Sequence, residues 1–349
     1  MHVNENEIEI LTPDDWHCHL RDGAYLATTV PMAAKQFKRV VAMPNLMPPI
    51  ITVQDALQYR ERIMAYVPSD SDFTPLMTLY LTDDTTPMMI REAANANSVL
   101  GCKLYPAGVT THSDHGVNQI ERLYPLFSEM QAAKIPLLVH GEVNDSTIDI
   151  YDREAVFIER HLQPLLAQFP ELKVVLEHIT TAEAVDFVQS SSKHVAATIT
   201  PHHLLLNRNA MFVGGINPHH YCLPILKRHT HQAKLIQAAT SGNPHFFIGT
   251  DSAPHAKSRK ESGCGCAGIY HGNVAIELYV QVFDQAGALD KLEGFCSRFG
   301  ADFYGLPYNQ QTLRIQKSPK KIPEWIAFGD EILTPFMAGL TLPWQAITS

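Results

Sequence analysis

Eight short apolar runs alternate with helical runs along almost the whole chain, and this alternation constrains the fold more than any other feature. The apolar runs are typical of buried strands, and they occupy residues 7–11 with the segment leading to His17, then 39–43, 74–81, 99–104, 135–140, 173–178, 195–200 and 246–251. Helical spacing occurs at 24–36, 52–66, 87–97, 118–133, 154–168, 181–190 and 230–240, and again at 273–285 and 289–299. This order predicts an α/β fold, a (β/α)8 TIM barrel, with additional C-terminal helices and a tail.

The chain of 349 residues contains no linker and no low-complexity break, so we expect a single barrel domain over 1–349. The competing fold is a doubly wound open sheet, which often carries a glycine-rich phosphate-binding turn after an early strand. No such glycine pattern follows an early strand here. The sequence therefore favours the barrel.

Polar residues that could bind a metal fall at or near the C-terminal ends of the predicted strands. They are His17, His19, Lys103, His140, His178 and Asp251. In a β/α barrel those strand ends all open on one face, so these side chains are expected to meet. His17 and His19 are two apart on a strand and share one face, where their imidazoles can converge on Zn²⁺ or a similar ion.

Each of these residues also has an ordinary structural interpretation. A strand-end histidine such as His140 or His178 can bond to backbone, Lys103 could lie on the surface, and Asp251 could cap a helix. A barrel explains all six placements at once, and we therefore favour a shared site. Arg21 lies just beyond the first two histidines, where its planar guanidinium could bind a substrate carboxylate.

Composition limits the class of partner. The net charge of -9 and the pI near 6.0 argue against nucleic acid or an anionic membrane as the main partner, but they allow a small anionic substrate. The six cysteines show no disulfide or zinc-knuckle spacing, so we expect reduced thiols. The polar, acidic start is not that of a signal peptide, and no apolar run approaches about 18 residues. We therefore expect a cytoplasmic protein.

Two motifs give the chain a family resemblance. The segments 15–23, Asp-Trp-His-Cys-His-Leu-Arg-Asp-Gly, and 249–255, Gly-Thr-Asp-Ser-Ala-Pro-His, followed by Lys260, resemble the signatures of the dihydroorotases. That family belongs to the amidohydrolase superfamily. The likeness extends through 43–45, 103–106, 261–268 and 303–307, and it is strongest to the compact bacterial type without fused domains. Cys18 replaces a more usual aliphatic residue, and 269–273 is less typical of the family.

The resemblance implies a centre of two zinc ions. His17, His19 and Asp251 would bind one ion, and His140 and His178 the other. Lys103, carboxylated by CO₂ to N6-carboxylysine, would bridge the two ions together with a hydroxide. The implied reaction is the reversible cyclisation of N-carbamoyl-L-aspartate to L-dihydroorotate in pyrimidine synthesis, with Asp251 as the general acid and base.

The resemblance also implies contacts to a small-molecule substrate. The carboxylate would be held by Arg21, Asn45 and His255, with His19 and His140 close to the ligand. Leu223 and Ala267 would offer backbone groups to the ring amides. The loop 105–116 resembles a mobile flap, in which Thr110 and Thr111 donate hydrogen bonds. On their own residues, Asn45 could be a turn residue, His255 a loop cap, and the loop merely solvated.

Three other functions compete with this interpretation. A hydantoinase or an allantoinase also fits a two-metal site, but the Arg21, Asn45 and His255 cradle favours an acidic substrate. A single-metal deaminase would have no use for Lys103. A catalytically silent barrel is expected to lack metal ligands, whereas here all six positions are filled. Because relatives are usually homodimers, we expect a homodimer.

Overall fold

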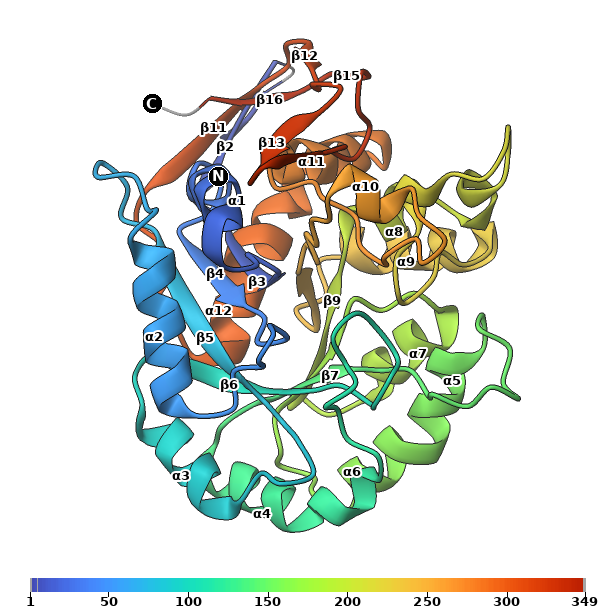
Figure 1. Cartoon of the computed structure of the whole chain (residues 1–349). Coiled ribbons are helices and arrows are strands. Elements are labelled where there is room, and N and C mark those ends of the chain that lie inside the picture. Colours follow the sequence, from blue (N-terminus) through green and yellow to red (C-terminus); the bar gives the residue numbers. More distant parts are fainter. Residues whose placement is uncertain (1, 5, 348–349) are drawn as a thin grey trace.

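The predicted barrel is present in the computed structural model, which describes residues 2–4 and 6–347 (Figure 1). Eight parallel strands form one sheet, and each is hydrogen-bonded to the next along the chain. They are β3 (Asp14–Cys18), β4 (Arg39–Ala42), β5 (Thr74–Tyr80), β6 (Val99–Leu104), β7 (Leu137–His140), β8 (Val174–Glu177), β9 (Val195–Ile199) and β10 (Phe246–Ile248). Their residues are almost all buried, as expected of parallel strands covered by helices.

Backbone hydrogen bonds join the first strand to the segment after the last one and so close the barrel. The Asp251 amide donates to the His17 carbonyl at 2.8 Å, and the His19 amide donates to the Ser252 carbonyl at 3.0 Å. The Asp15 carboxylate supports the same junction, because it accepts from the Thr250 amide at 2.8 Å and from its hydroxyl at 2.6 Å. Closure therefore places the residues after β3 beside those after β10.

Helices surround the barrel (Figure 1). The longer ones are α1 (Leu26–Ala34), α2 (Val53–Met64), α3 (Pro87–Asn95), α4 (Tyr124–Ala133), α7 (Ala182–Ser190), α9 (His229–Thr240) and α11 (Ala275–Gln285). A π-helical turn, η3 (Ile158–Leu162), joins α5 (Arg153–Phe157) to α6 (Gln163–Gln168). Shorter pieces are η1 (Gly23–Tyr25), η2 (Ile120–Leu123), α8 (Pro201–Leu205), η4 (Arg208–Met211), η5 (Pro218–His220), α10 (Lys257–Lys260) and η6 (Leu289–Lys291). Threonine side chains cap α2, α3 and α7 by accepting from the amide three residues on, which fixes where these helices begin.

The prediction for the first strand is wrong in one respect. Residues 7–11 do not lead into the barrel: β2 (Glu7–Leu11) ends before Pro13, and the barrel begins with the separate strand β3. β2 pairs antiparallel with β11 (Thr312–Gln316). Its alternation of buried Ile8 and Ile10 with less buried neighbours is typical of an antiparallel sheet with one covered face, not of a barrel strand.

The C-terminal region contains both the predicted helices and additional strands. The predicted helix at 289–299 is irregular: η6 and the π-helical η7 (Gly294–Arg298) precede α12 (Phe299–Tyr304). α12 packs closely on β3, because a Cβ on Gly300 would lie only 2.0 Å from Trp16. The tail forms β11 and β16 (Gln345–Ile347), which join β1 (His2–Val3) and β2 in one sheet. Two further pairs are β12 (Lys320–Lys321) with β15 (Thr341–Leu342), and β13 (Ile326–Phe328) with β14 (Glu331–Leu333).

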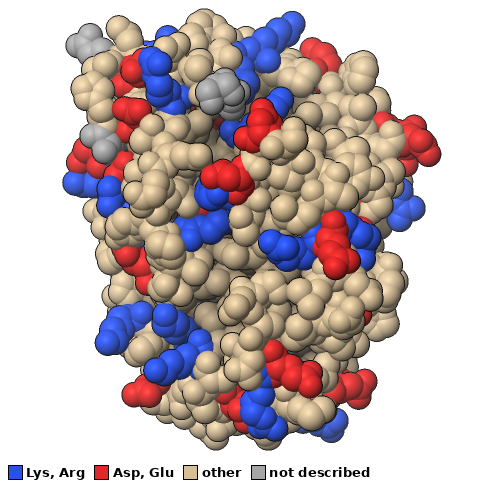
Figure 2. Space-filling model, turned by 90° about the vertical axis from the view of Figure 1, so that its left-hand side faces the viewer, with Lys and Arg blue, Asp and Glu red and all other residues tan. Residues whose placement is uncertain are grey.

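Other predictions from composition can be compared with the structure. All six cysteines are free thiols, as predicted. Within residues 2–4 and 6–347, no helix has the length and apolar character that a membrane crossing requires. Basic and acidic side chains are interspersed over the face shown in Figure 2.

Candidate active site

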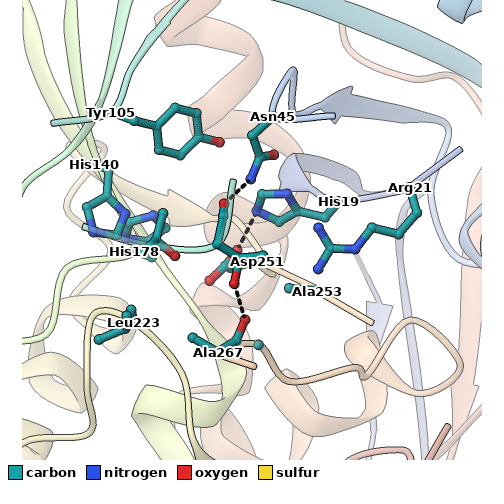
Figure 3. Close-up of a pocket in the computed structure, with 13 residues that line it drawn as sticks. His19, Arg21, Asn45, Tyr105, His140, His178, Leu223, Asp251, Ala253 and Ala267 are labelled. Carbon is teal, nitrogen blue, oxygen red and sulfur yellow. Dashed lines mark hydrogen bonds and ion pairs between the residues drawn. The ribbon is translucent and has the colours of Figure 1, made fainter. Parts of the chain in front are cut away.

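The six strand-end residues meet at one end of the barrel. His17 is the next-to-last residue of β3, Lys103 lies in β6, and His140 ends β7. His178 follows β8 and Asp251 follows β10. All are buried, and four line one pocket, in which His140 and His178 lie on one side of Asp251 and Arg21 on the other (Figure 3). The shared placement expected from the sequence is thus observed.

Three ligand atoms converge in the first group. The Nε2 atom of His17 lies 3.3 Å from Oδ1 of Asp251, and Nε2 of His19 lies 3.0 Å from the same oxygen. The two imidazole Nε2 atoms are 3.4 Å apart. A carboxylate oxygen and two ring nitrogens at these separations can bind a single cation.

The second group contains His140, His178 and Lys103. The ring centroids of His140 and His178 are 4.8 Å apart, and those of His178 and His17 are 4.9 Å apart, so the two groups are contiguous. Among the described residues, no hydrogen-bond partner reaches the Lys103 Nζ atom or the His178 Nδ1 atom, although both are buried. Such orphaned polar atoms require an explanation, which a bound group would provide.

Two glutamates that the sequence reasoning missed orient these histidines. Oε2 of Glu177 accepts from Nδ1 of His17 at 2.7 Å and from the Thr198 hydroxyl at 2.8 Å. Oε2 of Glu142 lies 2.8 Å from Nε2 of His140. Carboxylates that fix the second ring nitrogen are usual behind metal-bound histidines. A signal for Glu177 was present, since an acidic residue at the end of the apolar strand 173–178 requires a partner.

The electrostatics keep most of the ligand atoms in the form that metals bind. Burial lowers the pKa of His19 to about 4 and holds that of His178 well below its usual range, so both rings are neutral near pH 7. His17 differs, because the Glu177 and Asp251 carboxylates outweigh burial and raise its pKa. Burial would raise the pKa of Asp251, but hydrogen bonds from His17 and His19 hold it well below its usual range. Asp251 is therefore ionised.

Backbone strain concentrates at this site. Arg21, His178 and Asp251 have positive φ angles of 62°, 42° and 48°. Residues other than glycine rarely adopt this conformation, which costs roughly 1–3 kcal/mol and persists where the surroundings enforce it. The strained backbone aims these side chains toward the pocket, which is typical of a functional centre.

These residues fit the binding of divalent metal. Four imidazoles and one ionised carboxylate provide the nitrogen-rich set that Zn²⁺ favours. Lys103 of the second group is buried next to Tyr105, whose ring centroid is 5.0 Å from Nζ, and within residues 2–4 and 6–347 its Nζ has no hydrogen-bond partner. Burial lowers the pKa of Lys103 to about 8, which increases the fraction of neutral amine.

The opposite wall of the pocket presents groups suited to an anionic substrate. Nε of Arg21 donates to the Pro254 carbonyl at 2.9 Å, and its Nη2 lies 3.0 Å from Nε2 of His255. Leu223 and Ala267 line the same pocket. His255 lines an adjoining outer cavity, which Arg21 and Asn45 also line, and its Nε2 lies 2.9 Å from the Ala267 carbonyl.

The loop 105–116 covers this wall. Its base is pinned by two hydrogen bonds between Val117 and the segment 105–107. At its tip the Thr111 carbonyl accepts from the Asn45 side-chain amide at 3.1 Å, and the Thr111 hydroxyl lies 3.4 Å from the Ala267 carbonyl. Thr110 lines the pocket, and its amide donates to the Ser113 hydroxyl. The loop thus contacts Asn45 and Ala267, two of the residues that were expected to bind the substrate.

Comparison with known proteins decides the family. Residues 11–319 match the profile of the amidohydrolase family. The chain is 59% identical to the dihydroorotase of Teredinibacter turnerae over 340 residues, covering 97% of this chain and 98% of that one. It is 56% identical to the dihydroorotase of Nitrosococcus oceani with the same coverage. The chain belongs to the dihydroorotase family.

Solved structures of dihydroorotases share the whole fold. The Saccharomyces cerevisiae dihydroorotase in complex with 5-fluoroorotic acid superposes with a TM-score of 0.91 at 36% identity, over 98% of both chains. The Campylobacter jejuni dihydroorotase gives a TM-score of 0.90 at 34% identity, over 99% of both chains. An L-hydantoinase of Arthrobacter aurescens shares the fold at a TM-score of 0.82 but only 16% identity, over 97% of this chain and 82% of that one. The resemblance inferred from the two motifs is confirmed.

A second group of possible metal ligands, two histidines and a cysteine, lies outside the residues that the dihydroorotase resemblance assigns. One ligand atom each of His202, His203 and Cys222 lie within 4.8 Å of one another, all buried. Two of the three already have a structural role, because the Pro224 carbonyl accepts from His203 Nε2 at 2.9 Å and from the Cys222 thiol at 3.4 Å. We therefore interpret these two as anchors of the segment that carries Leu223.

Proposed function

We propose that this chain catalyses the reversible cyclisation of N-carbamoyl-L-aspartate to L-dihydroorotate and water, a step of pyrimidine (UMP) synthesis. The observation that carries the proposal is the match to dihydroorotases over nearly the full length at 56–59% identity. The pocket supports it, because it combines a metal-type ligand cluster with Arg21, a cation suited to the carboxylate that distinguishes dihydroorotate from simpler cyclic amides.

The proposed cofactor is a pair of Zn²⁺ ions. His17, His19 and Asp251 would hold one ion, His140 and His178 the other, and carboxylated Lys103 would bridge them. When bound, such ions supply an activated water near neutral pH and polarise the carbonyl that is attacked. Carboxylation would proceed by attack of the neutral Lys103 amine on CO₂, which forms an N–C bond, releases a proton and leaves an anionic ligand with two oxygens.

Asp251 is the proposed general acid and base. In the hydrolytic direction its ionised carboxylate would accept the proton of the attacking water and deliver it to the departing ring nitrogen. In the synthetic direction the same transfers run backwards. Closure converts a carboxylate and a ureido N–H into a ring amide and water and consumes a proton, so a lower pH shifts the equilibrium toward the ring.

The remaining pocket residues would bind and enclose the substrate. Arg21, Asn45 and His255 would hold the retained carboxylate, which keeps it away from the cations. Backbone groups of Leu223 and Ala267 would meet the ring amides, with His19 and His140 against the ligand. The loop 105–116 would exclude water by closing over the substrate, with Thr110 and Thr111 as hydrogen-bond donors.

The first experiment follows the ultraviolet absorbance of L-dihydroorotate with wild type, Lys103→Ala and Arg21→Met. Dihydrouracil, hydantoin and allantoin serve as competing substrates. We expect wild type to prefer dihydroorotate and Lys103→Ala to be inactive. Arg21→Met should lose the preference for dihydroorotate over dihydrouracil, which differ only in the carboxylate. Turnover of hydantoin or allantoin alone would contradict the proposed substrate, and activity of Lys103→Ala would contradict the bridging role.

We further propose that the enzyme is a cytoplasmic homodimer. The absence of a membrane-crossing helix from residues 2–4 and 6–347 is consistent with this location. Light scattering of the purified, metal-loaded chain should give twice the chain mass of 38.9 kDa. A mass of one chain would contradict the dimer.

A further inference from the structure

Lys260 is a buried cation that the proposed mechanism does not use. It ends the short helix α10, and only 3% of its surface is exposed. Its Nζ donates to three backbone carbonyls, those of Tyr221 at 2.8 Å, Cys266 at 2.7 Å and Gly268 at 2.8 Å. An ammonium group has three N–H donors, so its hydrogen-bonding capacity is fully used.

The three carbonyls belong to two segments that lie side by side here. One segment runs from Tyr221 to Leu223, and the other from Cys266 to Gly268. They also share a direct hydrogen bond, from the Gly268 amide to the Tyr221 carbonyl at 3.0 Å. Leu223 and Ala267, which both line the pocket, are thus each within two residues of a carbonyl that Lys260 binds.

A buried lysine ammonium is energetically unfavourable for a purely structural role at this position. Burial of an ammonium costs several kcal/mol unless its partners compensate. In the described part of the chain, no carboxylate lies within ion-pair distance of Lys260, so the charge is surrounded by three backbone carbonyls and by the Tyr221 ring, whose centroid is 5.8 Å from Nζ. The backbone is also closely packed at Gly268, because at its φ of 150° a Cβ would lie 2.6 Å from the Ala253 carbonyl.

We propose that Lys260 is a positioning residue for substrate recognition. By binding both segments, it sets the spacing of the Leu223 and Ala267 backbone groups to match the two amides of a six-membered cyclic ureide. The inference rests on the proposed function, since it assigns a specificity role within that same pocket. A misplacement of about 1 Å in such a contact can cost roughly 100-fold in kcat/KM.

The surroundings of Lys260 predict a pH signature. Burial lowers its pKa to about 8, so the ammonium loses a proton, and with it one of three hydrogen bonds, as the pH rises through that value. The charged and titratable groups that face it are Arg21, the Cys222 and Cys266 thiols, the Tyr221 ring, His255 and His220. Burial holds the pKa of His255 at about 2 and raises that of Cys222 to about 12, so neither changes charge near pH 8.

The test compares wild type with Lys260→Met, Lys260→Arg and, as a matched control, Lys257→Met at the first residue of the same helix, where the side chain is 44% exposed. Steady-state kinetics with L-dihydroorotate are measured from pH 6.5 to 9.5 at saturating Zn²⁺, with metal content determined for each variant. For Lys260→Met we expect KM to rise about 100-fold, with a much smaller change in kcat and unchanged metal content. Wild-type KM should rise above about pH 8, and Lys260→Arg, which stays charged, should lose this rise.

Amide hydrogen exchange separates recognition from folding. In Lys260→Met, exchange should accelerate in peptides that cover 221–224 and 266–268 and nowhere else. Unchanged KM in this variant, or a wild-type KM that is flat across pH 8, would overturn the proposal, as would exchange that accelerates throughout the chain. If wild type fails to turn over dihydroorotate, the proposed function is wrong, and the exchange pattern alone then decides whether Lys260 joins the two segments.

Discussion

Lys103 illustrates how one buried side chain can acquire a role through its surroundings. It is fully buried and, in the ranges 2–4 and 6–347, has no hydrogen-bond partner at Nζ. Its folded-state pKa of about 8 is lower than the usual 10.5, so the neutral amine fraction rises about tenfold per pH unit up to pH 8. We therefore predict that, at constant dissolved CO₂, carboxylation of the metal-free protein accelerates with rising pH and levels off above pH 8.

The measurement is the ¹³C NMR signal of the carbamate formed from ¹³CO₂, followed with time between pH 6 and 9. Lys103→Met provides the control, because it keeps a long side chain but has no amine. A carbamate signal of equal intensity in Lys103→Met would assign the modification to another amine. A rate that does not change between pH 6 and 8 would contradict the lowered pKa.

Glu177 provides a second prediction for a single residue. Glu177→Gln keeps an oxygen acceptor for His17 and the Thr198 hydroxyl but removes the negative charge. Because that charge raises the basicity of His17, we expect zinc affinity to fall by about 10- to 100-fold. Competition with a chromogenic chelator measures this loss. Glu154→Gln is the matched control, since Glu154 is equally buried but accepts from Thr180 and Thr181. Equal zinc affinity in wild type and Glu177→Gln would contradict the role.

The residues that the sequence revealed and those it concealed differ in a physical way. His17, Lys103 and Asp251 could be found because barrel topology alone brings strand ends together. The roles of Glu142 and Lys260 depend on which partner each side chain contacts. The partners of Lys260 are backbone carbonyls, which cannot be recognised from the types of residue that carry them. These two roles can be recognised only from the three-dimensional structure.

At the scale of elements, the loop 105–116 carries a testable contact. The Thr111 hydroxyl reaches the Ala267 carbonyl, and the Thr111 carbonyl accepts from Asn45. Thr111→Val removes the hydroxyl but keeps the shape. The loss of one hydrogen bond, worth about 1 kcal/mol, should raise KM about fivefold in both reaction directions. Thr147→Val, on an exposed loop after β7, should leave KM unchanged. A KM for Thr111→Val equal to that of wild type would show that this hydroxyl does not contribute to closure.

The strands were predictable to within a few residues because continuous apolar runs identify buried parallel strands. The first strand was the exception. The alternation at 7–11 was correctly interpreted as a strand, but its partner, β11, lies about 300 residues later. Local pattern cannot reveal such a distant pairing. The broken helix before α12 was missed for a similar reason, since π-helical turns leave no distinct periodicity in the sequence.

At the scale of the whole molecule, β2 pairs with β11 and so joins the N-terminal strands and the tail in one sheet of β1, β2, β11 and β16. Trp344 fastens this sheet to the barrel: it is fully buried, its Nε1 donates to Asp284 of α11 at 2.9 Å, and Lys317 lies over its ring. Trp344→Ala should lower the free energy of unfolding by about 3–5 kcal/mol. Because none of these contacts involves the pocket, kcat and KM for dihydroorotate should stay at wild-type values. Urea denaturation at saturating Zn²⁺ measures the stability change.

Trp325→Ala is the control, because Trp325 is 57% exposed and its loss should change the unfolding free energy by no more than about 0.5 kcal/mol. Equal losses in the two variants would mean that the terminal sheet does not stabilise the barrel, and a fall in kcat for Trp344→Ala would mean that the sheet also shapes the site.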